Sequence, residues 1–455
     1  MDETSTSFSR LLEPLINVVD TSLNPEDASR KSRRGRPAGV SLGALLVATI
    51  RQKVFRRGAM DEHVEKTTGK RLEASTVSRR LASITADRLE TVGEALLRPL
   101  GDPQSNPEGY RREYRLVGVD GTRFALCNAE AILQKIPKRT ARRSREDELV
   151  EVAFPEIWAC SLVELGPHNP LAVKVALDGE SEIELGIDLL KHLGPDDMLL
   201  GDRLYGVGWY LHNLLTNSRC GALLLKVNPT QSSRRIEQLE DGSWIVEVDV
   251  RSRRRPADII ASHRVREIVY EIASTRAEGK RERIVYRLWT NLMDPQLDPA
   301  EELAWLYHRR WEHECYYREL KLELKKHKHL DAQLLETAHI QILSMVWASA
   351  LIARERQRLT AYKDKNCESP RQVRFDVVQE HIRVLWALGK QIGSTLSEEQ
   401  FHAIAESLSE EARAYTMPQK RSRTCPRKVR QNQKHWPKIR ERTEKDPNIN
   451  ITIVS

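Results

Sequence analysis

Residues 307–321 of the 455-residue chain read YHRRWEHECYYRELK, and they hold its most specific pattern. At about 100° per residue of an α-helix, four side chains share an arc of roughly 60°: Tyr307, Arg310, Glu314 and Lys321. One stripe of the helix then presents a phenol, a guanidinium, a carboxylate and an ammonium group. A carboxylate can complete a metal site, while arginine and lysine bind phosphates beside a phosphodiester. Taken alone, the stripe is better explained as a solvated helix with salt bridges.

Two aspartates upstream follow short apolar runs that are typical of buried strands. Asp120 stands in LVGVDGT, residues 116–122, and Asp202 stands in MLLGDRLYG, residues 198–206. We expect Asp120 to end a strand at a glycine turn, and Asp202 to end another strand ahead of a helix. Strands hold carboxylates on rigid supports, which a metal site requires. Each aspartate alone is more simply structural, because a strand-end Asp-Gly is a common turn, as at Asp178-Gly179.

The segments around these motifs alternate between strand and helix patterns. Strands are predicted at 114–119, 157–165, 171–177, 198–201 and 222–227, with helices at 182–193 and 208–216. This mixture indicates an α/β layer domain. Residues 228–295 show polar–apolar alternation and predict an antiparallel β insertion. The chain is predicted to be helical from 299 to about 413, and the basic tail from Pro418 is expected to be unstructured without a partner.

Residues 1–110 are predicted to be mainly helical, with a first clear helix at 42–55 capped by Ser41. A further helix is expected to start at Ser75, with Arg79 and Arg80 in a basic first turn. Such a start can enter a major groove, and an ordinary surface helix fits equally well. Arg34 and Arg36 lie in RRGRP, residues 33–37, which resembles the core of an AT-hook. An extended segment of this kind fits a narrow minor groove.

The composition favours nucleic acid as the partner and argues against zinc fingers and membrane spans. The net charge is +8 and the pI is about 9.1, with basic runs at 30–36, 251–255 and 420–445. The 6 cysteines are scattered without a CxxC pair. The longest apolar candidate, 340–353, is short of the ~20 residues that cross a bilayer, and the acidic start lacks a secretory pattern. We therefore expect a cytoplasmic protein of about three domains that does not enter a membrane.

The histidines near the stripe are not expected to bind a metal. His308 and His313 diverge by about 140° on a helix, and His327 and His329 also diverge. We interpret them as solvated or DNA-facing side chains.

Together, these motifs resemble the insertion sequence 4 family of DDE transposases. The stripe matches that family's Tyr-(2)-Arg-(3)-Glu-(6)-Lys signature at every spacing. Asp120-Gly121-Thr122 and Asp202-Arg203-x-Tyr205 are similar to its two aspartate motifs, and Thr290-Asn291-Leu292 also fits its pattern. The similarity covers roughly residues 112–355. It implies a ribonuclease-H-like catalytic core at 111–355 with the β insertion at 228–295. A helical DNA-binding domain at 1–110 and a helical C-terminal region with a basic tail at 356–455 would flank this core.

The resemblance also implies the roles of individual residues. Asp120, Asp202 and Glu314 would hold Mg²⁺ or Mn²⁺, and Tyr307, Arg310 and Lys321 would contact DNA phosphates. Tyr286, or its neighbour Trp289, would stack on a flipped base. The implied activity is cleavage at the ends of an insertion sequence, followed by joining of the 3′-hydroxyl ends to target DNA. The implied partners are double-stranded DNA and a second copy of the chain in the DNA complex, within the bacterial nucleoid.

Three other functions fit the same residues. A metal-dependent nuclease with this core would cut DNA without strand transfer. A catalytically silent DNA-binding regulator would bind without cutting, although the presence of all three carboxylates argues against it. An RNA-processing enzyme fits the charge as well, and comparing its affinities for duplex DNA and RNA at matched salt would separate the two.

Overall fold

The computed structural model describes residues 12–23, 39–142, 149–252, 255, 257–275, 281–325, 327–361, 372–392, 395–417 and 450–453. The chain divides into two compact units. The first unit comprises Met1–His192 and Glu312–Gln419, and the second comprises Leu193–Trp311 and Lys420–Ser455. Because each unit joins segments distant in sequence, its boundaries differ from those of the three predicted domains, which remain a prediction.

The first unit contains an antiparallel meander of β2 (Tyr114–Ala125), β5 (Glu156–Glu164) and β6 (Asn169–Val175), with β5 in the middle. Most of β5 is buried, as its apolar run predicted. A short strand, β1 (Tyr110–Arg111), pairs with β2, and β3 (Thr140–Arg142) and β4 (Leu149–Glu151) form a separate hairpin. Helix α7 (Glu182–Asp188) and the 3-10 turn η2 (Leu189–His192) follow β6.

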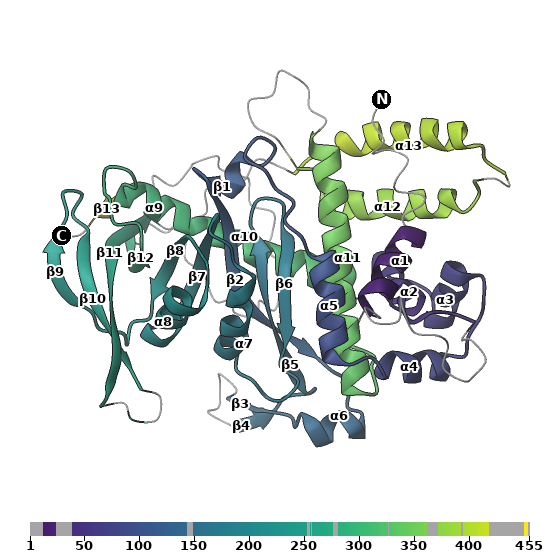
Figure 1. Ribbon diagram of the computed structural model, residues 1–455, viewed down its shortest axis with the longest axis horizontal. Coiled ribbons are helices and arrows are strands. Elements are labelled where there is room, and N and C mark those ends of the chain that lie inside the picture. The colour runs from purple at the N-terminus through teal and green to yellow at the C-terminus, as the bar shows by residue number, and fades with distance from the viewer. Residues whose placement is uncertain are drawn as a thin grey trace. The chain divides into compact units, whose positions relative to one another are not determined.

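The helices of the first unit gather around one long helix, α11 (Leu335–Ala361), which contacts α2 on one side and β6 on another (Figure 1). Besides α7 and α11, the helices described in this unit are α1 (Leu12–Leu23), α2 (Leu42–Phe55), α3 (Met60–Thr68), α4 (Ala74–Ala82), α5 (Ala86–Leu96), α6 (Glu130–Lys135), α10 (Trp311–Glu319), α12 (Phe375–Gly389) and α13 (Glu398–Arg413). The π-helical turn η4 (Leu320–Leu324) follows α10, and η1 (Pro107–Gly109) precedes β1.

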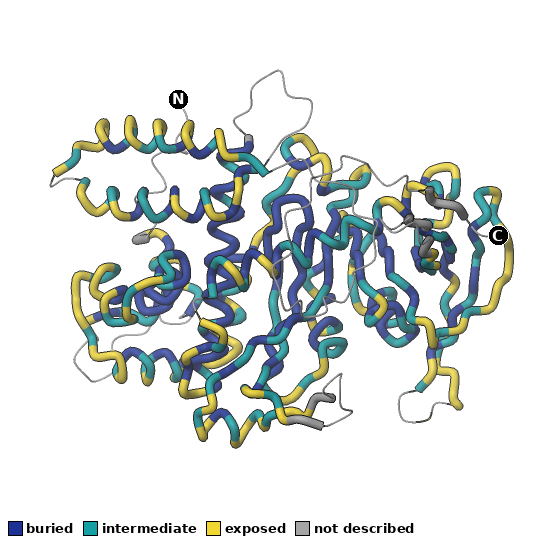
Figure 2. The backbone as a smooth tube through the Cα atoms, turned by 180° about the vertical axis from the view of Figure 1, so that it is seen from behind, coloured by how far each residue is buried: buried dark blue, intermediate teal, exposed yellow. Residues whose placement is uncertain are grey.

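Helix α11 is the one element of the described chain that is long and apolar enough to cross a membrane by length and composition alone. Its 26 candidate residues extend beyond the 340–353 segment considered above, but 83% of the most apolar window is buried inside the protein. Figure 2 shows this burial along the helix. Such burial is typical of a core helix, which satisfies its apolar surface with neighbouring helices and strands.

The second unit begins with a parallel pair, β7 (Asp197–Gly206) and β8 (Ala222–Val227), joined by α8 (Gly208–Asn217). Its sheet has the order β7-β8-β12-β11-β10-β9, and its members after β8 are antiparallel to their neighbours. These strands are β9 (Arg234–Gln238), β10 (Trp244–Arg251), β11 (Ile259–Thr275) and β12 (Arg281–Thr290). The antiparallel strands predicted for residues 228–295 are therefore confirmed. Helix α9 (Ala300–Tyr307) and the 3-10 turn η3 (His308–Arg310) follow.

Several local predictions need correction. Asp120 and Asp202 lie inside β2 and β7 rather than at strand ends. The predicted helix start at Ser75 is one residue late, because α4 begins at Ala74 after Glu73, whereas the Ser41 cap of α2 is confirmed by its bond from the Ala44 amide. In the tail, β13 (Asn450–Ile453) pairs with β11, so this part is not unstructured.

Candidate active site

Asp120 lies in the middle of β2, opposite Ser161 of β5, with 18% of its side chain exposed. The next residue, Gly121, is not a turn. Its amide donates to Asp120 Oδ1 at 3.0 Å and to Glu182 Oε1 at 2.9 Å. A Cβ atom on Gly121 would lie 2.4 Å from the carboxyl carbon of Glu182, so only glycine lets this side chain of α7 approach β2. Glu182 is thus a carboxylate beside Asp120 that sequence reasoning missed.

Helix α10, which carries Glu314, packs against β2 at Asp120. The Tyr317 hydroxyl donates to the Asp120 carbonyl oxygen at 2.7 Å, and it lies 2.9 Å from the Ser161 hydroxyl. His313 Nε2 is 3.1 Å from the same Ser161 hydroxyl, and its Nδ1 is 3.8 Å from Asp120 Oδ2. His313 is completely buried, so the prediction that it faces solvent or DNA is wrong. These contacts bring the helix of Glu314 against the strand of Asp120.

Lys321 lies on η4, with its Nζ 5.5 Å from the centre of the Phe124 ring. Burial lowers the pKa of Lys321, the charge of Lys325 lowers it further, and Glu156 and Asp120 oppose both effects. Lys321 is therefore a partly desolvated cation within the electrostatic reach of Asp120. The stretch 307–321 combines α, 3-10 and π turns, so the ideal helical arc predicted for its four residues does not describe it.

In the second unit, Asp202 lies where β7 leaves its regular pairing with β8. The parallel ladder is regular up to Gly201 opposite Leu225, and it resumes only at Gly206 opposite Val227. Gly206 is required there because a Cβ atom would lie 1.8 Å from the Lys226 carbonyl oxygen. The Leu204 amide donates to Asp202 Oδ1 at 2.8 Å and holds the carboxylate across this irregular stretch. Asp202 is thus fixed by a break in the ladder and not by the end of a strand.

A group of cations and phenols shares the neighbourhood of Asp202. Burial raises the pKa of Tyr307. The positive charge of Arg310 and its hydrogen bond lower this pKa, and the negative charge of Asp202 raises it. Burial also lowers the pKa of Lys226, as do Arg310 and Arg203, whereas Asp202 raises it. Lys226 therefore lies within electrostatic reach of the Asp202 carboxylate and of two further cations. Nothing in the sequence marked Lys226, because its place one residue beyond the partner of Gly201 is set by the pairing of β7 with β8.

The two aromatic candidates of β12 have different environments. Tyr286 is half-buried and stacks on Tyr270, directly opposite on β11, at 5.1 Å between ring centres and 12° between planes. The Nζ atom of Lys226 lies 4.1 Å from the centre of the Tyr286 ring. Trp289 is completely buried and donates from Nε1 to Glu267 at 3.1 Å. The prediction that Trp289 stacks on DNA is therefore corrected, because no face of its indole is open.

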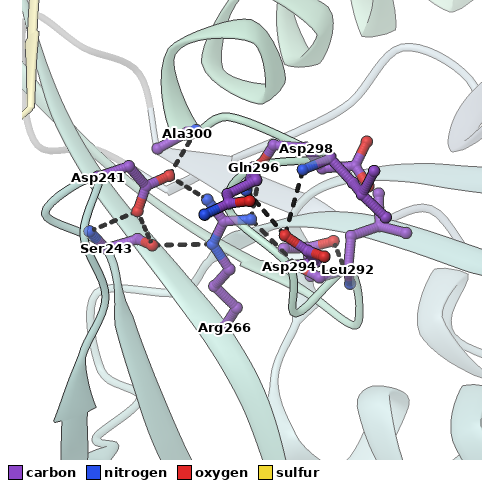
Figure 3. Close-up of polar contacts among 10 residues, drawn as sticks. Asp241, Ser243, Arg266, Leu292, Asp294, Gln296, Asp298 and Ala300 are labelled. Carbon is purple, nitrogen blue, oxygen red and sulfur yellow. Dashed lines mark hydrogen bonds and ion pairs between the residues drawn. The ribbon is translucent and has the colours of Figure 1, made fainter.

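A buried arginine fixes the start of helix α9, which ends at Tyr307 (Figure 3). Arg266 of β11 donates to the carbonyl oxygens of Asp298 at 2.7 Å and Leu292 at 3.2 Å, and to the Ser243 hydroxyl at 2.8 Å. It also forms an ion pair with Asp241, which in turn accepts from the Ala300 amide at 2.8 Å. A carboxylate at a helix N-terminus satisfies an otherwise free amide. This network ties β11 and the turn before β10 to the helix that presents Tyr307.

Residues 113–351, more than half of the chain, match the family described as Transposase DDE domain. The chain belongs to this family. All six residues of the predicted site lie within the matched part: Asp120, Asp202, Tyr307, Arg310, Glu314 and Lys321. A solved structure titled as the piggyBac transposase synaptic complex with hairpin DNA, determined by cryo-EM, is similar at 7% identity and a TM-score of 0.43. The similarity covers 89% of this chain and 84% of that one. No curated protein matches.

The predicted N-terminal DNA contacts of this DDE transposase are described only in part. Arg79 and Arg80 lie in the last turn of α4, not in its first turn as predicted. Arg79 is exposed, whereas Arg80 donates to the Val40 carbonyl oxygen at 2.6 Å. Arg80 therefore serves the packing of the helical region, and Arg79 is the freer candidate for a DNA contact. Arg34 and Arg36 lie outside the described residues.

The residues predicted to hold metal belong to different units of the DDE transposase. Asp120 and Glu314 belong to the first unit and Asp202 to the second. Within the part of the chain that the structure describes, no three histidine, cysteine or acidic side chains form a group that could hold a metal ion. The predicted donors are carboxylate oxygens, which suit Mg²⁺ or Mn²⁺ and not a soft metal. Their chemistry therefore fits the ion that the family resemblance implies.

Proposed function

We propose that this DDE transposase cleaves DNA at the ends of an insertion sequence and joins the resulting 3′-hydroxyl ends to target DNA. Asp120, Asp202 and Glu314 are its metal-binding carboxylates in this proposal. The observation that carries it is the packing of α10 on β2, where Tyr317 bonds the Asp120 backbone and His313 approaches its carboxylate. That packing supports Asp120 and Glu314 as members of one site. The signature spacing further supports assignment to the insertion sequence 4 branch.

We infer that the catalytic core is ribonuclease-H-like and is interrupted by the β insertion. The antiparallel meander β6-β5-β2 and the parallel pair β7-β8 with its connecting helix α8 support this inference. The β9–β12 sheet is the insertion. The helices before β1 would recognise the element ends, and the region after residue 355 would contribute the helical C-terminal part and basic tail.

The chemistry assigned to the site is displacement at an anionic phosphorus. Asp120, Asp202 and Glu314 would hold divalent ions, which would supply activation of the nucleophile and stabilisation of the leaving oxygen. The chain itself would orient the DNA. Arg310, Lys226 and Lys321 are cations that bind phosphates, and the Tyr307 hydroxyl, held by Arg310, adds a neutral donor. Tyr286, half-buried beside Lys226, is the proposed platform for a flipped base.

Double-stranded DNA, at both the element ends and the target, is the proposed partner. Two ends must be processed together, so we propose a homodimer in the DNA complex. The reaction is proposed to take place in the bacterial cytoplasm, on nucleoid DNA.

An end-joining assay tests the proposed function. Candidate ends are taken from inverted repeats that flank the gene, and an oligonucleotide with an exposed 3′-hydroxyl is incubated with supercoiled plasmid, protein and Mg²⁺. We expect the oligonucleotide to become covalently joined to the plasmid. Cutting without joining would instead identify a nuclease, binding without either activity a regulator, and preference for RNA at matched salt an RNA-processing enzyme.

Replacing Lys226 with methionine is expected to weaken binding to end DNA and to reduce the slope of log affinity against log salt by about 1. The reason is that one phosphate would lose its cation while the side chain's apolar stem remains. Fluorescence anisotropy over a salt series measures both quantities. Lys135→Met removes an exposed cation that pairs with Glu336 and serves as the matched control. An unchanged slope in Lys226→Met would exclude Lys226 from phosphate binding.

A further inference from the structure

His168 has an unusual backbone conformation in the turn that joins β5 to β6. Its φ of 55° lies in the left-handed region, which non-glycine residues rarely adopt. Such a conformation persists only where surrounding contacts hold it, and it is concentrated at functional positions. The turn itself is held by Gln372, which donates to the Gly166 carbonyl oxygen. We therefore expect the contacts of the His168 ring to hold this backbone conformation.

Both ring nitrogens of His168 bond carboxylates of helix α10. Nε2 lies 2.7 Å from Glu312 Oε2, and Nδ1 lies 2.9 Å from Glu319 Oε2. An ionised carboxylate only accepts hydrogen bonds, so both nitrogens donate only if the ring is a charged imidazolium. Only 1% of the His168 side chain is exposed. Burial alone would lower the pKa of His168, but Glu319 and Glu312 outweigh it and raise the pKa above its usual value.

The bonds of His168 span the helix that carries Glu314. Glu312 is the second residue of α10 and Glu319 is the last, so Glu314 lies between the two attachments. Glu319 also bonds Arg356 of α11 at 2.9 Å. Burial opposes ionisation of Glu319, yet the charges of Arg356 and His168 hold its pKa at about 2. Contacts from His168 to Glu319 and from Glu319 to Arg356 thus connect the β5–β6 turn, α10 and α11 through charged, buried side chains.

We propose that His168 is a positioning residue for Glu314. Its imidazolium clamps α10 at both ends, and so sets where the Glu314 carboxylate stands against the strand of Asp120. The strained turn delivers the ring between the two glutamates. This inference rests on the proposed function of Glu314 as a metal ligand. A positioning role differs from a purely structural one, because loss of the clamp would change the affinity of the site for metal as well as the stability of the protein.

The test compares His168→Asn with the wild-type chain and with His339→Asn. Asparagine tolerates the left-handed conformation but is too short to reach both glutamates. His339 is another buried histidine of the first unit, on α11, and it is the matched control. We expect faster amide hydrogen exchange across residues 311–319 in His168→Asn, without DNA or metal, and no such change in His339→Asn. Unchanged exchange in 311–319 would overturn the clamp regardless of whether the protein is a transposase.

A second measurement addresses positioning itself. We expect the Mg²⁺ concentration for half-maximal end cleavage to rise by about 10- to 100-fold in His168→Asn, with end-DNA affinity in Ca²⁺ unchanged. A lower melting temperature with an unchanged Mg²⁺ dependence would reduce His168 to a structural role. Failure of the proposed function would look different, because then either the wild-type protein would not cut end DNA or Glu314→Gln would cut it equally well. The exchange result would still decide whether the clamp exists.

The pH dependence of hydrogen exchange in the wild-type protein tests the clamp without any substitution. The pKa of His168 is raised on folding, so its stabilisation is fully present below pH ~6.5, the usual value, and is lost as pH rises through the folded pKa. The charged groups facing it are Glu312 and Glu319 of α10, with Arg356 of α11 behind Glu319. In the wild-type protein, we expect the protection of residues 311–319 from hydrogen exchange, corrected for intrinsic exchange rates, to decrease as the pH rises through the folded pKa of His168. A flat profile would contradict the clamp. If His168→Asn does not fold, His168→Gln, which keeps one donor, replaces it.

Discussion

Replacing Glu314 with glutamine is expected to abolish end cleavage while end-DNA binding stays within about twofold of the wild type. Glutamine keeps the size of the side chain but removes the charge that would hold a divalent ion in the proposed site. Losing several kcal/mol of transition-state stabilisation corresponds to a rate lower by about a thousandfold or more. Asp120→Asn and Asp202→Asn are expected to behave in the same way, because in a shared site each carboxylate is indispensable. Cleavage with Mg²⁺ and binding with Ca²⁺, on the same end DNA, measure the two effects separately.

The control for these substitutions is Asp178→Asn. Asp178 precedes Gly179, as Asp120 precedes Gly121, but it is exposed, in a turn where Gly179 has a φ of 83°. It resembles the first aspartate motif in sequence and differs from it in structure. We expect Asp178→Asn to cut at the wild-type rate. Undiminished cutting by a variant of Asp120, Asp202 or Glu314 would remove that residue from the proposed triad.

Replacing Arg266 with methionine is expected to lower the free energy of unfolding of the second unit by about 3–5 kcal/mol. The Arg266 side chain has no exposed surface. Its removal takes away the ion-pair partner of the Asp241 carboxylate and the guanidinium that donates to the carbonyl oxygens of Leu292 and Asp298. Losing one partner of a buried charge network costs far more than losing a surface pair. We expect the start of α9 to loosen with it, since Asp241 also holds the Ala300 amide.

Hydrogen exchange of β11 and α9 amides over a urea series would measure this loss in the full-length chain. The matched control is Arg283→Met, on the neighbouring strand β12. The Arg283 side chain is 68% exposed and pairs with Glu271, so its loss is expected to cost about 0–1 kcal/mol. If the two variants were equally stable, the Arg266 network would not be what fixes α9.

Local sequence patterns predicted the secondary structure around the site well. The run at 222–227 coincides with β8, and the alternating block after it forms β9 to β12. These features were accessible because apolar periodicity and strand propensity act over a few neighbouring residues. The Asp-Gly at 120–121 misled for the same reason. Its local pattern is that of a turn, whereas the glycine is needed because Glu182, 61 residues further along, presses against the strand.

Which side chains surround each carboxylate depended on long-range packing. Lys226 joins Asp202 because two parallel strands are neighbours, and His313 is buried because α10 covers β2. Tyr286 and Trp289 lie in the same alternating stretch of sequence, yet Tyr286 is half-buried and Trp289 is completely buried.

The sequence by itself determined the candidates for the chemistry, namely the three carboxylates and the Tyr-Arg-Glu-Lys spacing, because residue type and order need no fold to be read. The tertiary structure alone decided which neighbours hold them in place: Glu182 at Gly121, Lys226 near Asp202, and His168 between Glu312 and Glu319. The physical reason is that burial and charge pairing are set by segments that meet only on folding. The residues next to a histidine or a tryptophan in the sequence do not show whether its side chain will contact water, DNA or a glutamate.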